Sequence, residues 1–293
     1  MIDSRRAIYL LMVIAVAIPV LLKFSFSPAR MVSAERMFKV IQEAEVKPGE
    51  VAMVWLDFGP GTIAENQTQA EVVVEHLLRR RIPIILIAQY QQAEAFLKSI
   101  PRDIALKLEK EYPGEAWRYG DDWINVGYKP VANLFIQSLA ATEDVSTLLA
   151  KDVNGSALTG FPKFAKIGGI EHIRLVAEVT GLQGVFDNII QFFQKDGYRP
   201  LVVHGCTSIT IPEAYIFLDS GQLNGLLEGI SGAAWYSSLL KKEFPNRAND
   251  TTLVRNTAIG VAQVVILLLI VAGNIVSIVS RSRSVSRSRR KHA

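Results

Sequence analysis

The chain has 293 residues, a formal net charge of +4 and a single cysteine, Cys206. One cysteine excludes an intrachain disulfide bond and a cysteine-rich metal site. Six positive side chains lie in the last thirteen residues, so the rest of the chain carries a net charge of about −2, with basic and acidic residues interleaved. A nucleic-acid-binding domain gathers its basic residues on the folded body, and we therefore expect no nucleic-acid partner.

An apolar run at residues 7–22 follows Arg5 and Arg6 near the start of the chain. A helix of roughly 20 apolar residues crosses a bilayer core, so we interpret residues 1–33 as an N-terminal transmembrane anchor. A cleaved signal peptide is the alternative. The residues after the run, from Lys23 to Pro28, contain no small-x-small cleavage site, which favours the uncleaved anchor.

Residues 34–247 have the pattern of one α/β domain. Apolar, β-branched runs alternate with helical patterns, which is typical of a parallel sheet covered by helices. The runs are apolar almost throughout, which indicates burial on both faces. We predict a Rossmann-like, doubly wound, mainly parallel sheet of about five strands, flanked by N- and C-terminal transmembrane helices. The predicted strands are residues 51–57, 83–88, 123–128, 173–179 and 201–204.

Two segments have the form of a capping box, the pattern in which a Ser or Thr and an acidic residue close the start of a helix. They pair Thr62 with Glu65 and Thr210 with Glu213, and we expect helices to begin there. Residues 151–169 are rich in glycine and proline and predict a long loop. Such a loop either covers a ligand or only connects two elements.

The turn after the first strand matches the G-x-G-x-x-A variant of the dinucleotide fingerprint, with Gly59, Gly61 and Thr62 as candidate cofactor-binding residues. Two features oppose this interpretation. Asp57 would place a carboxylate beside a diphosphate, and the second predicted strand ends without an acidic residue for a ribose. We therefore expect no cofactor, and we interpret the motif as a turn that leads into a helix.

Polar residues at the predicted strand ends are candidates for catalysis, because loops and helix N-termini converge there in a parallel sheet. A histidine beside a carboxylate would act as an oriented base, and a nearby thiol or hydroxyl as nucleophile. The segment around Cys206 is not the G-x-S-x-G elbow, and the histidines lack metal-binding spacing. The catalytic candidates are Asp57, Lys129, Glu178, His204, Cys206 and Ser208.

Glycines recur at helical spacing toward the end of the body, at Gly221, Gly225, Gly229 and Gly232. Glycine weakens a helix by roughly 1 kcal/mol per position, so a glycine-lined helix needs close backbone packing as compensation. The compensation comes from the domain's own sheet, from a helix broken by turns, or from another subunit. We therefore retain these four glycines as interface candidates.

Residues 248–280 contain a second apolar run, at 257–279, and predict a C-terminal transmembrane helix. Gln263 and Asn274 lie inside it, and polar residues in membrane helices often face a partner helix. A basic tail follows at residues 281–293. Positive residues next to membrane helices stay in the cytoplasm, so two crossings place both termini in the cytoplasm and the central domain outside, in the periplasm or the extracellular space.

These observations predict a membrane-anchored, extracytoplasmic α/β domain that acts as a non-catalytic scaffold, assembly or ligand-sensing subunit of a membrane complex. Its expected partners are the lipid bilayer and either other membrane-protein subunits or a second copy. One alternative is a membrane-tethered hydrolase or transferase that uses the strand-end residues. The other is a solute-binding domain of a transporter, which needs a ligand-sized cleft under the loop at residues 151–169. We lean against an enzyme and expect no metal site.

Overall fold

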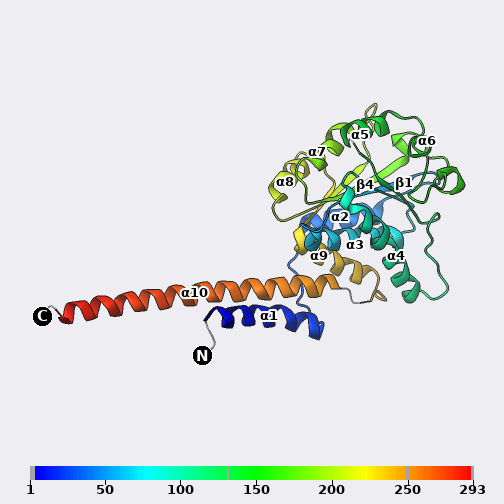
Figure 1. Cartoon of the computed structure of the whole chain (residues 1–293). Coiled ribbons are helices and arrows are strands. Elements are labelled where there is room, and N and C mark those ends of the chain that lie inside the picture. The colour runs from blue at the N-terminus through cyan, green and yellow to red at the C-terminus, as the bar shows by residue number, and fades with distance from the viewer. Residues whose placement is uncertain (1–3, 131, 249–250, 292–293) are drawn as a thin grey trace. The chain divides into compact units, whose positions relative to one another are not determined.

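The computed structural model describes residues 4–130, 132–248 and 251–291 (Figure 1). The chain divides into two compact units. One unit combines Met1–Pro28 with Asp250–Ala293 and contains the two terminal helices, and the other is the α/β body, Ala29–Asn249. The boundary that we predicted at residue 34 falls inside the first helix of the body, α2 (Val32–Glu43).

The body contains one six-stranded sheet, and all neighbouring strands are parallel. The strand order is β3-β2-β1-β4-β5-β6, the order of the Rossmann fold. Nearly all strand residues are buried, as expected for a sheet covered on both faces. The strands are β1 (Val51–Asp57), β2 (Ile84–Ala88), β3 (Trp123–Tyr128), β4 (Ile173–Thr180), β5 (Leu201–Cys206) and β6 (Gly225–Glu228).

Helices cover both faces of the sheet (Figure 1). One apolar core joins the sheet to α2 and to α3 (Ile63–Arg79), α4 (Glu94–Glu111) and α9 (Gly229–Glu243). A second core joins it to α5 (Ala132–Ala141), α6 (Val145–Leu149), α7 (Val185–Phe192) and α8 (Ile211–Asp219). Among the described residues, 3-10 turns complete the body at η1 (Gln91–Ala93), η2 (Leu158–Gly160) and η3 (Ile170–His172).

The connections change face between β1 and β4, which are neighbours in the sheet. The helix after β1 packs on one face, and the helix after β4 packs on the other. In a doubly wound sheet, the carboxyl ends of the strands at such a switch point are the usual ligand crevice. The fold therefore brings the loops after β1 and β4 together.

The predicted Rossmann-like α/β class and all five predicted strands are confirmed, and β6 is an additional sixth strand. The glycine-lined helix that we considered from Gly221 onward is wrong. Gly221 lies in a turn with a φ of 76°, Gly225 opens β6, and only Gly229 and Gly232 belong to a helix, α9. The four glycines therefore do not form one helical strip.

Close packing inside the chain explains two of these glycines. A Cβ on Gly225 would lie 2.3 Å from the Cα of Met37, because α2 passes directly over the edge strand β6. A Cβ on Gly232 would lie 2.9 Å from the carbonyl carbon of Leu227. Gly225, Gly229 and Gly232 are buried in the body, which agrees with packing against its own sheet.

The two predicted capping boxes mark the correct helix starts but do not form. Neither Thr62 before α3 nor Thr210 before α8 makes a side-chain cap hydrogen bond. Glu65 instead accepts hydrogen bonds from the backbone N–H and the hydroxyl of Ser208, at 2.9 and 2.7 Å. A long-range contact between the loop after β5 and α3 thus replaces the local cap.

The terminal unit consists of α1 (Ser4–Leu22) and α10 (Thr251–Lys291). By length and composition both are able to cross a membrane, with mean hydropathies of 2.0 over Arg5–Leu22 and 2.6 over Thr251–Ser277. The backbone N–H of Phe26, just after α1, donates to Thr257 Oγ1 near the start of α10 at 2.9 Å. Because the two helices also pack along each other, they run antiparallel.

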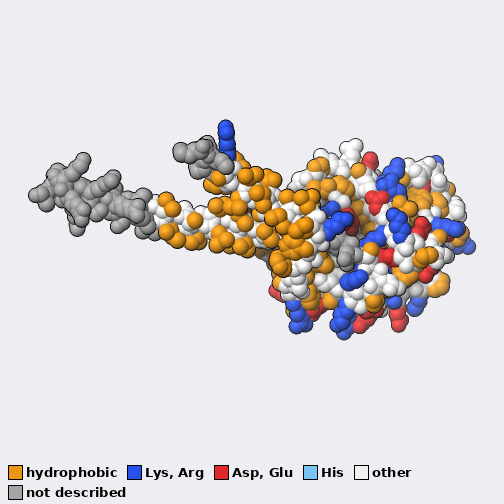
Figure 2. All heavy atoms as spheres, turned by 90° about the horizontal axis from the view of Figure 1, so that it is seen from below, with side chains coloured by type: hydrophobic (Ala, Val, Ile, Leu, Met, Phe, Trp, Pro, Cys, Tyr) orange, Lys and Arg blue, Asp and Glu red, His pale blue; other side chains and the backbone are white. Residues whose placement is uncertain are grey.

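Apolar side chains cover the described surface of both terminal helices, whereas charged side chains are spread over the α/β body (Figure 2). Leu21 is 77% exposed, and Leu268 and Val276 are 64% and 67% exposed. Large apolar side chains that lie next to one another and remain exposed mark a surface that contacts lipid or protein. The helix α10 also continues through the basic tail that we predicted as a separate segment.

Candidate functional site

Three of the catalytic candidates lie together at the carboxyl end of the sheet. Glu178 on β4 is in register with Trp55 on β1 and with His204 on β5. Asp57 lies two residues beyond Trp55, and alternate residues of a strand share one face. Asp57, Glu178 and His204 therefore project from the face that α5 to α8 cover, and they are buried, with exposures of 0%, 0% and 3%.

Asp57 and Glu178 form a buried carboxyl pair. One oxygen of Asp57, Oδ1, accepts hydrogen bonds from the backbone N–H groups of Gln89 and Tyr90, at 2.5 and 2.9 Å. Its other oxygen and both oxygens of Glu178 are buried without a further partner. Burial raises the pKa of Asp57 to about 6, and burial together with the negative charge of Asp57 raises the pKa of Glu178. The pair favours a shared proton, as like charges at close range do.

His204 does not face this carboxyl pair as an oriented base. Its Nδ1 lies 3.0 Å from the backbone oxygen of Glu178, and its ring stacks on Phe186 at 4.1 Å between centroids. Burial lowers the pKa of His204 to about 4, so the ring is neutral near pH 7. It lines a cavity of only about 10 Å³ with Thr180 and Thr210, which has room for about one water molecule.

Of the other three candidates, Lys129 lies apart from this group, and the surroundings of Cys206 and Ser208 disfavour reaction. Lys129 follows β3, which is separated from β4 by β2 and β1, and partial burial lowers its pKa. Cys206 is buried at the end of β5, and burial raises its pKa to about 12, which disfavours the reactive thiolate. The hydroxyl of Ser208 donates a hydrogen bond to Glu65. The structure thus brings together two carboxyls and an imidazole in apolar packing, away from Lys129.

The chain itself fills the region of the dinucleotide fingerprint. A Cβ on Gly181, in the loop after β4, would lie 2.5 Å from Thr62 Cγ2 and 2.8 Å from Thr207 Cγ2. A Cβ on Gly59 would lie 2.7 Å from Gln92 Oε1, whereas Gly61 faces open space. The loops after β1, β4 and β5 are therefore in contact where a dinucleotide would need a crevice. These residues do not fit a dinucleotide.

The part of the chain that the structure describes also contains no cluster of metal-ligating side chains. Within those residues, no three or more His, Cys, Asp and Glu side chains gather closely enough to hold a metal ion.

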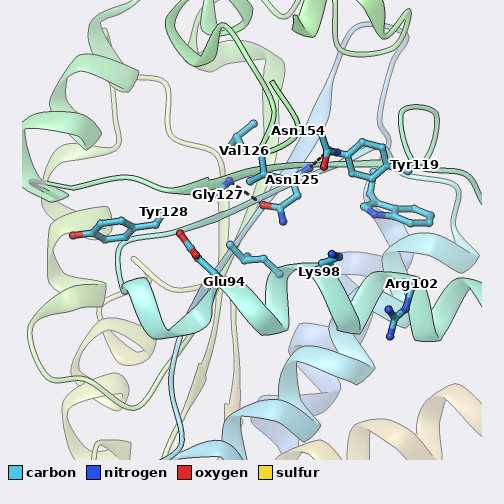
Figure 3. Close-up of a pocket in the computed structure, with 12 residues that line it drawn as sticks. Glu94, Lys98, Arg102, Tyr119, Asn125, Val126, Gly127, Tyr128 and Asn154 are labelled. Atoms are coloured by element: carbon cyan, nitrogen blue, oxygen red, sulfur yellow. Dashed lines mark hydrogen bonds between the residues drawn. The ribbon is translucent and has the colours of Figure 1, made fainter. Parts of the chain in front are cut away.

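A different candidate site, which sequence analysis missed, lies along the edge strand β3 (Figure 3). It is a cavity of about 630 Å³ between β3, α4 and the loop after α6. Small-molecule sites commonly measure about 300–1,000 Å³ and combine apolar walls with a few polar groups. The lining residues are Glu94, Leu97, Lys98, Arg102, Tyr119, Trp123, Asn125, Val126, Gly127, Tyr128, Val153 and Asn154.

Asn125 places a hydrogen-bond donor at this cavity. Its Oδ1 accepts a hydrogen bond from the backbone N–H of Gly127 at 2.9 Å, which leaves Nδ2 as the free end of the amide. Figure 3 shows the side chain pointing from β3 toward α4, between Glu94 and Lys98. Asn125 is only 5% exposed, so the β3 backbone and the surrounding side chains hold this donor in place.

The β3 backbone is irregular at the same point. The register with β2 shifts between Leu86 and Ile87, and Gly127 has a φ of 76°. A Cβ on Gly127 would lie 2.8 Å from Val153 Cγ1. Glycine is therefore required by the bulge and by the close approach of the loop.

The loop at residues 151–169 closes the outer edge of β3. The backbone N–H of Val153 donates to the Asn125 oxygen at 2.9 Å, and that of Gly120 donates to the Trp123 oxygen at 2.8 Å. These bonds occupy backbone groups that an added strand would otherwise use. The loop also lines the cavity with Val153 and Asn154.

Another cavity, of about 700 Å³, lies near residues 44–50 at the opposite end of the strands. The arginines that line it already have partners. Arg80 donates to the Ala44 oxygen, and Arg81 pairs with Glu115 at 2.6 Å while its guanidinium lies 3.8 Å from the Trp117 ring. The cavity beside β3 presents the buried amide donor of Asn125 and is the stronger candidate.

The fold and this cavity define a Rossmann-like α/β protein with a ligand-sized site at the edge of its sheet, away from the switch point. No protein-family model matches the chain, and neither a curated protein nor a solved structure matches it.

Proposed function

We propose that this protein is a membrane-anchored domain that binds and senses a small molecule. The cavity beside β3 carries the proposal, because it has the size of a ligand site and presents an almost fully buried amide donor. The switch-point residues support a non-catalytic role. Asp57 and Glu178 are buried, and the thiol of Cys206 is held in its neutral form by burial.

The anchoring part of the proposal rests on α1 and α10. Both are long and apolar enough to cross a bilayer, and they run antiparallel, so their chain ends lie on one side of the helix pair. The basic residues of the C-terminal tail favour a cytoplasmic location for that end. Both termini would then be cytoplasmic and the α/β body extracytoplasmic, with the lipid bilayer as the first partner.

Binding is tested on the full chain in detergent micelles. Hydrogen exchange is recorded with and without each compound of a chemically diverse panel, and native mass spectrometry detects any co-purified molecule. We expect a binder to protect residues 94–102 of α4 and 123–128 of β3. Asn125→Ala should remove this protection, whereas Asn224→Ala, which alters an amide at β6 that bonds to Val202, should retain it. A panel without any binder, or protection that survives Asn125→Ala, contradicts the proposal.

Assembly with other membrane subunits, or with a second copy, is a second candidate function that α10 favours. Gln263 and Asn274 are exposed along this apolar helix, and polar groups in a membrane helix gain from a partner helix. Mass measurement of the detergent-extracted protein tests it. We expect a dimer or a complex that Gln263→Leu with Asn274→Leu disrupts, and a monomer that co-purifies with nothing would contradict assembly.

A further inference from the structure

The α4 wall of the cavity beside β3 is polarised in charge. Glu94, Lys98 and Arg102 are spaced four residues apart, so they follow one face of the helix. The rise of a helix places Glu94 and Arg102 roughly 12 Å apart. Within the described residues, Glu94 and Lys98 have no hydrogen bond or ion pair, whereas Arg102 contacts only the exposed Asp103. The wall thus offers an unpaired carboxylate at one end, an unpaired ammonium group in the middle, and at the other end a guanidinium group whose partner is the exposed Asp103.

The opposite wall places a neutral donor between these charges. Figure 3 shows the Asn125 side chain between Glu94 and Lys98. Its Nδ2 is the free end of the amide, because Oδ1 is bound to the Gly127 backbone. The order along the cavity is therefore carboxylate, amide donor and ammonium. A complementary ligand carries a cation, then a carbonyl oxygen, then an anion.

We infer that the cavity takes a short peptide, of two or three residues, with both termini free. The α-amino group pairs with Glu94, a peptide carbonyl accepts from Asn125 Nδ2, and the terminal carboxylate pairs with Lys98 or Arg102. Extended chain rises about 3.3 Å per residue. A dipeptide of roughly 7 Å therefore suits the rise of about 6 Å from Glu94 to Lys98, and a tripeptide of roughly 10 Å suits the rise of about 12 Å from Glu94 to Arg102. This inference rests on the proposed function, because it names the ligand class of the same cavity.

The remaining walls suit the side chains of such a peptide. Leu97 is a buried apolar residue of α4, and Trp123 and Tyr128 add aromatic surface. Aromatic surface contributes a large contact area at a binding site. Because Val153 and Gly120 already bond to the outer edge of β3, the peptide is recognised by its ends and not by strand addition.

Isothermal titration calorimetry on the full chain in detergent tests the inference with the tripeptide Ala-Phe-Ala. The matched probes are the same peptide with an acetylated N-terminus and with an amidated C-terminus. We expect the free peptide to bind, and each blocked form to bind at least about tenfold more weakly, because each block removes one charge-assisted contact.

Variants test which side chain of the cavity binds each terminus of the peptide. In Glu94→Gln, acetylation of the peptide should no longer weaken binding, whereas amidation still should. In the double variant Lys98→Gln with Arg102→Gln, amidation should no longer weaken binding, whereas acetylation still should. Asp219→Asn and Lys110→Gln are matched controls, because both side chains are exposed and lie outside the cavity. They should leave the effects of acetylation and amidation unchanged.

The outcomes separate the inference from the proposed function. Equal binding of free and blocked peptides overturns the inference. A second result also overturns the inference: no peptide binds, but a non-peptide compound slows hydrogen exchange in α4 and β3, and Asn125→Ala removes this effect. That result would keep the proposed function. If neither peptides nor any other compound of the panel protects these elements, both are overturned.

Discussion

Glu75 on α3 and Arg247, near the end of the body, form a buried two-point ion pair. Arg247 Nε and Nη2 lie 2.7 and 2.9 Å from the two carboxylate oxygens of Glu75. Glu75 also pairs with Arg79 and Lys107, at 2.7 and 3.2 Å. Burial raises the pKa of Glu75, but the bonds and charge of Arg247 outweigh burial and lower it to about 2. This pair fixes the last segment of the body to α3.

Loss of Arg247 should destabilise the body strongly. We expect Arg247→Met to lower the free energy of unfolding by about 3 kcal/mol, because removal of one partner leaves buried charge without full compensation. Chemical denaturation followed by tryptophan fluorescence measures this change. Arg118→Met, at an exposed position, should change the free energy by less than about 0.5 kcal/mol. An Arg247→Met protein as stable as its parent would contradict the role of the pair.

The Asp57–Glu178 pair predicts a specific pH dependence. Folding raises the pKa of both carboxyls, that of Asp57 from 3.8 to about 6. The folded state therefore binds protons more tightly than the unfolded state, and the contribution of the pair to stability falls as the pH rises above about 4. Glu178→Gln keeps the shape and removes one titrating group. Relative to this variant, the parent should lose roughly 1–3 kcal/mol of stability between pH 5 and pH 8.

Denaturation curves at several pH values test this prediction. Glu45→Gln replaces an exposed carboxyl and should track the parent at every pH. A constant difference between Glu178→Gln and the parent across this range would mean that Glu178 does not gain its proton on folding.

Cys206 should be inert in the folded protein. It has no exposed surface, and burial raises its pKa to about 12, so little thiolate is present to react. We expect a disulfide reagent to leave the native protein unmodified and to titrate one thiol per chain in guanidinium chloride. Rapid modification of the native protein would contradict this prediction and would make Cys206 a candidate nucleophile again.

Gly225 should not tolerate a side chain. A Cβ there would meet the backbone of Met37 at 2.3 Å, and overpacking of this kind costs about 1–3 kcal/mol. We expect thermal unfolding of Gly225→Ala at a clearly lower temperature than that of the parent. Gly160 has open space around it, so Gly160→Ala should unfold at nearly the temperature of the parent. Equal stability of the two variants would contradict the close approach of α2 to β6.

The sheet was predictable because the apolar sequence pattern of its central strands identifies them. β1 is apolar up to Asp57 and β2 is apolar throughout, and their burial on both faces requires that pattern. β6 escaped prediction because it has only four residues, and because Gly225 at its start and Gly229 just after its end fall into helical spacing with Gly232. Glycine is required at position 225 because Met37 packs against it, and the local sequence does not encode this tertiary contact.

The carboxyl pair was predictable, but the cavity beside β3 was not recognised. Strand ends in a parallel sheet converge, so the prediction of a catalytic site required Asp57, Lys129, Glu178 and His204 to meet, and the structure brings together all of these except Lys129. The cavity depends on where α4 and a loop far along the chain pack. One signal was nonetheless present: Asn125 and Gly127 interrupt an otherwise apolar strand, and a glycine inside a strand often marks a bulge or a close approach.

Site-directed labelling tests the central claim, a bilayer-anchored body outside the cytoplasm, most directly. Because Cys206 is buried, the parent should give little background with a membrane-impermeant maleimide. Single cysteines are added at Asp219, which is exposed on the body, and at Ser288 in the basic tail. We predict that intact cells label Asp219→Cys, and that Ser288→Cys is labelled only after the membrane is opened. Labelling of Ser288→Cys in intact cells, or protection of Asp219→Cys, would contradict the account.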